Sequence, residues 1–232
     1  MFRAGEFTLP LGSRTYVMGV LNYTPDSFSD GGKYNTPEKA LEKALEMQAQ
    51  GADIIDIGGN STRPDAKILT AAEECERIKP ALEILKGRLD VPVSVDTFYP
   101  ACAKAALEAG ASIINDVSGA FNREMAVLAK EYGAGYVVMH NPCGAGIQAE
   151  YPDGVISHIR KFFIDAMELS AKAGLAKEQL CLDPGFGFSK SYEDNLEVLA
   201  NFQWLKFKGV ALLAAASRYP IGIPSLSLFL TA

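Results

Sequence analysis

Short apolar runs alternate with amphipathic segments along the whole chain, and this alternation is the main structural signal in the sequence. Each run is bounded by Gly, Asn or Asp, which is typical of a buried strand and not of a helix. The predicted strands are residues 16–21, 53–57, 91–95, 112–114, 136–139, 179–182 and 210–216.

The segments between these runs have helical spacing and recognisable start signals. Thr36 followed by Pro37 begins one helix, because Pro suits the first helical position, and Gly51 ends it. Thr70 and Glu73 form a capping box. The predicted helices are residues 36–48, 70–89, 101–109 and 155–173, and another begins at Ser191, capped with Asp194. Pro80 is expected to kink the second helix or to split it.

The spacing of the strands predicts parallel pairing, because each crossover is long enough to hold a helix. On spacing alone, a doubly wound sheet and a barrel both remain open. A barrel is favoured because every predicted strand ends in polar residues, as expected when all the loops surround one mouth. We therefore predict an α/β fold of the (β/α)8 TIM-barrel type, with seven βα strands, in a single domain of residues 1–232 whose tail, 219–232, is atypical.

Composition restricts the partners of this barrel. The chain has 232 residues, 48% of them hydrophobic, and a net charge of −6, so it lacks the basic surface that nucleic acid requires. No apolar run is long enough to span a membrane, and the N-terminus lacks the apolar core of a secretory signal. The four cysteines are widely separated and contain no Cys-x-x-Cys pair, which indicates reduced thiols. A cytoplasmic location follows as an expectation.

A polar loop follows the first predicted strand directly. It has small polar side chains and could gather oxygen ligands, although a solvated turn would look the same. The polar residues are Asn22, Thr24, Asp26, Ser27, Ser29 and Asp30.

Acidic and amide side chains also end four later strands, at Asp56, Asp96, Asn115 and Asp183. If these side chains converge, they can accept paired hydrogen bonds from a planar heterocycle that carries amino and ring N–H groups. Each acid could instead cap the helix that follows it.

Two arginines and two phenylalanines complete the candidate chemistry. Arg63 and Arg218 suit a phosphate or a carboxylate, with surface ion pairs as the alternative. Phe186 and Phe188 are expected to form walls for an aromatic ring, with core packing as the alternative. No nucleophilic Ser or Cys is predicted to form a triad with His140 or His158.

Five of these segments together resemble the dihydropteroate synthase family, in the order that the family shows, between residues 15 and 218. They are Asn22-Tyr-Thr-Pro-Asp-Ser-Phe-Ser-Asp-Gly-Gly32, Asp56-Ile-Gly-Gly-Asn-Ser-Thr-Arg-Pro64, Ser94-Val-Asp-Thr97, Asn115-Asp-Val-Ser-Gly119 and Asp183-Pro-Gly-Phe-Gly-Phe188. The resemblance implies a (β/α)8 barrel that joins 6-hydroxymethyl-7,8-dihydropterin diphosphate to 4-aminobenzoate and releases pyrophosphate in folate biosynthesis. It also implies a sulfonamide target and a possible homodimer.

The resemblance implies roles for individual residues. Asn22 would bind Mg²⁺, and Asp96, Asp183 and Arg63 would be catalytic. The pterin would be held by Asp56, Asp96, Asn115 and Asp183, with Met139 against its face. The loops over the diphosphate and aminobenzoate would contribute Asp30, Ser61, Thr62, Arg63, Pro64, Phe188, Ser217 and Arg218. Carboxylates would stabilise the cationic pterin methylene left when diphosphate departs, before the aromatic amine attacks.

The chain departs from the family pattern at three points. Asn60 stands where the family usually has Glu, Tyr219 follows Arg218 where a Lys is usual, and the usual Arg-x-His pair of the eighth strand is absent. A pterin-binding methyltransferase domain and a catalytically impaired pterin-binding remnant therefore stand as alternatives.

The tail is too short for a normal eighth βα unit. Nine residues separate Ala216 from Leu226, with Pro220 and Pro224 nearby, so no crossover helix fits. The alternating segment 225–230 can return only as an antiparallel strand, a plug or an exchange with another chain. We expect an open barrel, low synthase activity and concentration-dependent association.

Overall fold

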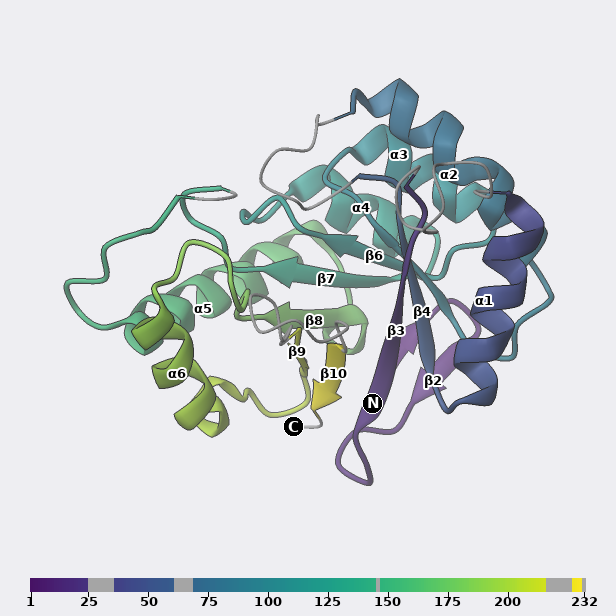
Figure 1. Ribbon diagram of the computed structural model, residues 1–232. Helices are drawn as coiled ribbons and strands as arrows, with labels where there is room; N and C mark the ends of the chain where they lie inside the picture. The colour runs from purple at the N-terminus through teal and green to yellow at the C-terminus, as the bar shows by residue number, and fades with distance from the viewer. Residues whose placement is uncertain (25–35, 61–68, 145–146, 216–226, 231–232) are drawn as a thin grey trace.

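The computed structural model describes residues 1–24, 36–60, 69–144, 147–215 and 227–230. Its central feature is a closed barrel with the strand order β10-β3-β4-β5-β6-β7-β8-β9 (Figure 1). The barrel strands are β3 (Tyr16–Asn22), β4 (Ile54–Gly58), β5 (Val93–Asp96), β6 (Ile113–Asp116), β7 (Gly135–Met139), β8 (Leu180–Asp183), β9 (Ala211–Ala214) and β10 (Ser227–Leu230). The pairs from β3 to β9 are parallel, which confirms the predicted fold class.

Helices cover the outside of the strands in Figure 1. They are α1 (Pro37–Ala49), α2 (Ala71–Leu85), α3 (Pro100–Glu108), α4 (Arg123–Glu131), α5 (Val155–Ala173) and α6 (Tyr192–Ala200), with the 3-10 turns η1 (Lys177–Gln179) and η2 (Phe202–Leu205). The predicted caps at Thr36, Thr70 and Ser191 are all present. Pro80 lies inside α2 without splitting it, and α2 ends at Leu85, four residues earlier than expected. Helix α4 was not predicted.

Two apolar cores follow from the alternation of side chains along the strands. The inner core fills the barrel and includes Met18, Ile54, Ile113, Val137 and Cys181. The outer core lies between the strands and the helices, and the intervening strand residues belong to it. A strand residue that belongs to the inner core therefore has its side chain in the barrel interior, and the strand residues on either side of it face the helices.

An N-terminal hairpin, which the sequence did not reveal, closes one end of the barrel. Strands β1 (Phe2–Ala4) and β2 (Phe7–Leu9) pair antiparallel, and Phe2 and Ala4 belong to the inner core. Phe2 packs so closely on Gly135, the first residue of β7, that a Cβ there would lie 2.5 Å from the Phe2 ring. This glycine is therefore required by packing and not by its backbone angles.

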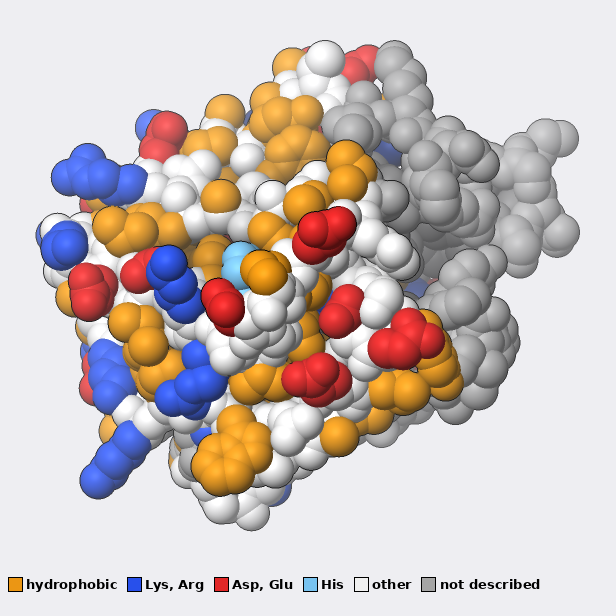
Figure 2. Space-filling model, turned by 90° about the vertical axis from the view of Figure 1, so that its left-hand side faces the viewer, with side chains coloured by type: hydrophobic (Ala, Val, Ile, Leu, Met, Phe, Trp, Pro, Cys, Tyr) orange, Lys and Arg blue, Asp and Glu red, His pale blue; other side chains and the backbone are white. Residues whose placement is uncertain are grey.

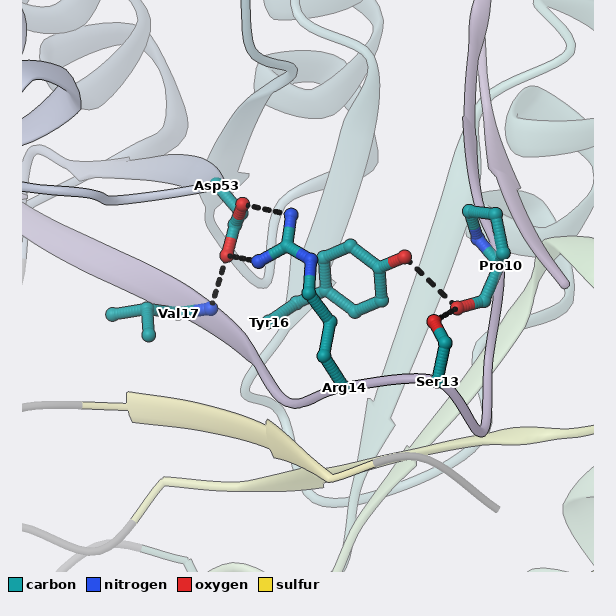
Figure 3. Close-up of polar contacts among 6 residues, drawn as sticks. All are labelled: Pro10, Ser13, Arg14, Tyr16, Val17 and Asp53. Carbon is teal, nitrogen blue, oxygen red and sulfur yellow. Dashed lines mark hydrogen bonds and ion pairs between the residues drawn. The ribbon is translucent and has the colours of Figure 1, made fainter.

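An ion pair fixes the segment between the hairpin and β3 (Figure 3). Both guanidinium nitrogens of Arg14 donate to Asp53, at 2.9 and 2.6 Å, and Asp53 also accepts from the Val17 amide at 2.9 Å. The hydroxyl of Tyr16 donates to the carbonyl of Pro10 at 2.8 Å. A bidentate contact of this kind holds the start of β3 beside the start of β4.

Strand β10 closes the barrel by running antiparallel to both of its neighbours. It pairs with β3 through Leu228 and Val17, and with β9 through Leu228 and Ala214. The antiparallel alternative is thus confirmed, and the expectation of an open barrel is wrong. A returning antiparallel strand needs only a short connection, whereas a parallel one needs a crossover.

Helix α6 leaves an apolar face uncovered. Tyr192, Leu196 and Leu199, spaced four and three residues apart, are 69%, 48% and 59% exposed, and Trp204 in η2 is 61% exposed. Residues at this spacing share one face of a helix. Figure 2 shows this side of the molecule, where hydrophobic side chains lie among charged ones. We call Tyr192, Leu196, Leu199 and Trp204 the α6 face.

Candidate active site

Five polar or adaptable side chains face the barrel interior at the carboxyl ends of neighbouring strands. On β4, β6, β7 and β8 the inner-core residue lies two positions earlier, so the side chain that follows it points the same way. On β5, Val93 and Val95 belong to the outer core, which turns Ser94 and Asp96 inward. The five residues are Asp56, Asp96, Asn115, Met139 and Asp183.

The strand register brings these residues side by side. Gly58 pairs with Asp96, and Asp96 with Asn115. Met139 pairs with Asp183. A Cβ on Gly58 would lie 3.3 Å from the Asp96 carboxylate, so glycine at this position leaves room for that side chain. The arrangement forms a wall of hydrogen-bond acceptors on one side of the mouth.

Asp56 and Asn115 form the buried base of this wall. The Asn115 side-chain amide donates to Oδ2 of Asp56 at 3.2 Å. Both residues are buried, at 4% and 8% exposed, yet Oδ1 of Asp56 and Oδ1 of Asn115 have no hydrogen-bond partner among the described residues. Buried acceptors are normally satisfied, so two unsatisfied oxygens that face one mouth fit the donors of a ligand.

Electrostatics distinguish Asp96 from an ordinary surface acid. Burial, followed by the nearby charges of Asp56, Glu74 and Asp116, raises the pKa of Asp96 well above its usual range. Burial also raises the pKa of Asp56, partly offset by the Ser94 and Asn115 side chains. The mouth therefore favours ligands that bring donors or positive charge.

Asp183 is oriented by the turn that follows β8. Its Oδ1 accepts from the Gly185 amide at 2.7 Å, and the residue is 3% exposed. Burial raises the pKa of Asp183 to about 6, against the lowering effects of the Gly185 amide and Lys190. Gly185 has φ +68° and lies against β7, where a Cβ would be 2.3 Å from the His140 carbonyl oxygen. Only glycine meets both conditions.

Lys190, which the sequence analysis did not single out, anchors the same turn. It is 6% exposed, and its Nζ lies within 3.2 Å of four acceptors. One of them is Nδ1 of His140, whose Nε2 lies 2.9 Å from Nδ1 of His158. The only signal in the sequence was a histidine at the end of one strand and a lysine after the Phe-rich turn.

The two phenylalanines of this turn have different environments. Phe186 stacks on Phe202 with ring centroids 6.0 Å apart and packs against the outer core. The structure thus supports the core-packing alternative for Phe186, because the turn places its ring against Phe202 in η2. Phe188 is half-buried and belongs to neither core.

Asn60 and Glu74 form a second contact that sequence reasoning missed. The Asn60 amide donates to Oε2 of Glu74, and its Oδ1 accepts from the Leu69 amide at 2.9 Å. Glu74 is fully buried, and burial raises its pKa. An amide at position 60 can donate to this acid, whereas a second carboxylate would repel it. This explains the departure at Asn60 in physical terms.

Of the remaining candidate residues, Asn22 lies among the described residues and the others lie outside them. Asn22 is exposed at the end of β3, opposite Gly58. Within the described residues, no three His, Cys, Asp or Glu side chains gather as a metal site. The candidates outside the described residues are Asp30, Ser61, Thr62, Arg63, Pro64, Ser217 and Arg218. The helices of the described part include none that is long and apolar enough to cross a bilayer.

The fold and this mouth define a (β/α)8-type barrel protein with a wall of inward-facing acceptors at the carboxyl ends of its strands. Residues 18–226 match the family described as pterin binding enzyme. A dihydropteroate synthase from Synechocystis sp. is 43% identical over 218 residues, which are 92% of this chain and 75% of that protein. The chain belongs to the pterin-binding enzymes and, within them, to the dihydropteroate synthase family.

Solved structures agree with this assignment. The dihydropteroate synthase of Clostridium difficile, determined in the presence of pteroic acid, has a TM-score of 0.84 and 40% identity, with 92% of this chain and 80% of that one covered. The Xanthomonas albilineans enzyme with 4-aminobenzoic acid has a TM-score of 0.78 and 40% identity, with 86% and 72% covered. The methyltransferase and remnant alternatives are not favoured.

Proposed function

We propose that this chain is a transferase that condenses 6-hydroxymethyl-7,8-dihydropterin diphosphate with 4-aminobenzoate to give 7,8-dihydropteroate and pyrophosphate. The observation that carries the proposal is the wall of inward-facing acceptors in a chain of this family, with one oxygen each on Asp56 and Asn115 that no described residue contacts by a hydrogen bond. The proposal takes residues 1–232 as one pterin-binding domain.

The pterin is assigned to the wall by complementarity. Its amino and ring N–H groups are donors, and Asp96, Asn115 and Asp183 supply acceptors on adjacent strands. Asp56 holds the amide of Asn115 so that its oxygen stays free for the ligand. Met139, 2% exposed between these strands, offers an apolar, polarisable surface to the ring face.

The chemistry then follows from charge. The bond between the pterin methylene and the diphosphate oxygen breaks, and the electron pair leaves with the diphosphate. The positive charge that develops on the pterin lies beside Asp96 and Asp183, which stabilise it. The amine of 4-aminobenzoate forms the new C–N bond and loses one proton to the released diphosphate or to water. We assign Phe188 to the aminobenzoate side. On the resemblance, the loop residues Asp30, Ser61, Thr62, Arg63, Pro64, Ser217 and Arg218 serve the diphosphate and the aminobenzoate.

A Mg²⁺ ion held by Asn22 is part of the proposal. A carboxamide oxygen at an exposed strand end suits a hard cation, but it is a single neutral ligand. Diphosphate oxygens and water would have to complete the coordination. When bound, the ion neutralises charge on the leaving diphosphate.

We also propose a cytoplasmic location and a homodimer. Cys75, Cys102, Cys143 and Cys181 are all free thiols, which suits a reducing compartment. The α6 face provides exposed apolar surface for a second copy. Sedimentation of the parent and of Leu196→Asp at several concentrations tests the dimer, since the variant is expected to stay monomeric.

The function is tested by pyrophosphate release from the two substrates with Mg²⁺. We expect turnover that requires both substrates and is lost in Asp96→Asn. Isothermal titration with 6-hydroxymethylpterin separates binding from catalysis. A chain that binds the pterin without turnover would support the impaired remnant, and one that binds neither substrate would contradict the proposal.

A further inference from the structure

We propose that Lys190 is a positioning residue for Asp183: it holds the turn of residues 184–188 against the end of β7 and places a buried positive charge near the Asp183 carboxylate. This inference rests on the proposed function only in taking Asp183 as a ligand-binding group. Among the described residues, Lys190 makes its hydrogen bonds to the turn and to His140 and to none of the five wall residues, so it acts through the turn and through its charge.

The first step is the clamp. Lys190 Nζ lies 3.0 Å from the carbonyl oxygens of both Gly185 and Phe188, 3.2 Å from the His140 carbonyl and 3.1 Å from His140 Nδ1. One buried ammonium therefore ties both ends of the turn to the end of β7. The three N–H groups of the ammonium are shared among these four acceptors, and charge-assisted bonds of this kind are stronger than neutral ones.

The second step links the clamp to Asp183. Gly185 is held on both sides, because its amide donates to Asp183 Oδ1 at 2.7 Å and its carbonyl accepts from Lys190. The His140 amide in turn donates to the Asp183 carbonyl at 2.8 Å. A displacement of the turn would therefore change the orientation of the Asp183 carboxylate.

The third step defines the protonation of the cluster. An ammonium only donates, so His140 Nδ1 must accept from Lys190, and His140 Nε2–H must donate to His158. Burial, then Lys190 and His158, lowers the pKa of His140 to about 3, so this imidazole is neutral. His158 is exposed on α5 and ends the chain of hydrogen bonds.

The last step is the charge balance. The titratable groups around Lys190 and Asp183 are His140 after β7, His158 on α5, Tyr151 before α5, Cys181 on β8 and Asp194 on α6. Burial lowers the pKa of Lys190 to about 8, so it is cationic at neutral pH. Its charge opposes the effect of burial on the pKa of Asp183, which reaches about 6.

The test is the titration of the Asp183 carboxyl carbon by ¹³C NMR in the ligand-free protein, assigned with Asp183→Asn. In Lys190→Met we expect the midpoint to rise by about 1 pH unit, because an opposite charge has been removed. Lys172→Met removes an exposed lysine of α5, 71% exposed, and should leave the midpoint unchanged. An unmoved midpoint in Lys190→Met would overturn the inference.

Two further measurements keep the result interpretable. In the parent protein, which needs no variant, the Asp183 signal should show a second change near pH 8 as Lys190 loses its proton, and a flat signal there would count against the clamp. Affinity for 6-hydroxymethylpterin, which lacks the titrating diphosphate, should fall at low pH, with the fall moved upward in Lys190→Met. If Lys190→Met loses the same fraction of its pterin affinity at every pH, Lys190 has only a structural role and the inference is overturned. A parent that titrates as expected but binds no pterin contradicts the proposed function alone.

Discussion

The side-chain amide of Asn115 on β6 donates to Asp56 on β4 at 3.2 Å, across the strand that lies between them. This bond fixes which end of the amide faces the mouth. Since the NH₂ group is engaged, the oxygen of Asn115 remains available to accept from a ligand. The Asn115 side chain, which could present either a donor or an acceptor to a ligand, therefore presents its acceptor oxygen.

We therefore expect Asp56→Asn to weaken pterin binding. An amide at position 56 can still accept from Asn115, but its own NH₂ then faces the donors of the ligand. One spoiled hydrogen bond of this kind costs on the order of 1.5 kcal/mol, or about tenfold in affinity. Isothermal titration with 6-hydroxymethylpterin measures it.

Asp116→Asn is the matched control. Asp116 is equally buried but faces away from the barrel interior, where it accepts from Tyr136 at 2.8 Å and from the Ser118 amide at 3.0 Å. Its variant should lose stability and keep pterin affinity, because removing this charge only lowers the pKa of Asp96, which remains an acceptor. Equal losses of pterin affinity in Asp56→Asn and Asp116→Asn would contradict the assignment of the pterin to the inner wall.

The stability of the ligand-free chain should depend on Asp183 between about pH 4 and 6. The pKa of Asp183 is about 6 when folded and near 3.9 when unfolded, so the folded state favours the protonated acid. Its contribution to stability is fully present below the unfolded value and is lost as the pH rises through the folded value. The change amounts to roughly 3 kcal/mol at most.

Urea denaturation at several pH values, compared between the parent and Asp183→Asn, isolates this contribution from the other acids. The stability of the variant relative to the parent should increase from pH 4 to 6 and then level off. If the difference in the free energy of unfolding between the parent and Asp183→Asn stays constant with pH, burial does not raise the pKa of Asp183.

Asn60→Asp should destabilise the fold. The new carboxylate would face Glu74, which is fully buried and now accepts from the Asn60 amide. Losing a donor and gaining a like charge should cost about 1–3 kcal/mol in the free energy of unfolding. Denaturant titration measures this cost, and adding Glu74→Gln should recover part of it. No recovery would mean that the two side chains do not interact.

Mg²⁺ binding should depend on pyrophosphate. Asn22 offers one neutral oxygen, so Mg²⁺ alone should bind weakly and pyrophosphate should strengthen its binding by completing the coordination. Asn22→Ala should abolish the enhancement, whereas Asn201→Ala at the end of α6 should not. Calorimetric titration of Mg²⁺ with and without pyrophosphate decides the matter. Unchanged affinity in the presence of pyrophosphate would contradict the role of Asn22.

Leu228→Pro should open the barrel. Proline removes the amide of a residue that pairs with Val17 on one side and Ala214 on the other. The freed edges of β3 and β9 would then promote association. Hydrogen exchange at β3 together with sedimentation at several concentrations would detect both effects. A protected, monomeric variant would show that closure does not depend on β10.

Local sequence determined most of the architecture. Apolar runs bounded by polar residues fixed seven parallel strands, and short-range caps at Thr36, Thr70 and Ser191 fixed the starts of three helices. The inward positions of Asp56, Asp96, Asn115 and Asp183 follow from alternation once the strands are known. These features depend on neighbours within a few positions, so a single sequence is enough to predict them.

Tertiary structure alone decided the rest. The contact between Lys190 and His140 joins residues 50 positions apart, and the burial of Phe2 depends on a strand more than a hundred residues later. The sequence left three alternatives for the tail, and the choice of the antiparallel strand depends on the edges of β3 and β9, which only the folded barrel brings to either side of β10. Phe186 turns to Phe202 because a folded turn places it there. No local propensity encodes these contacts, since each is made by packing between distant segments.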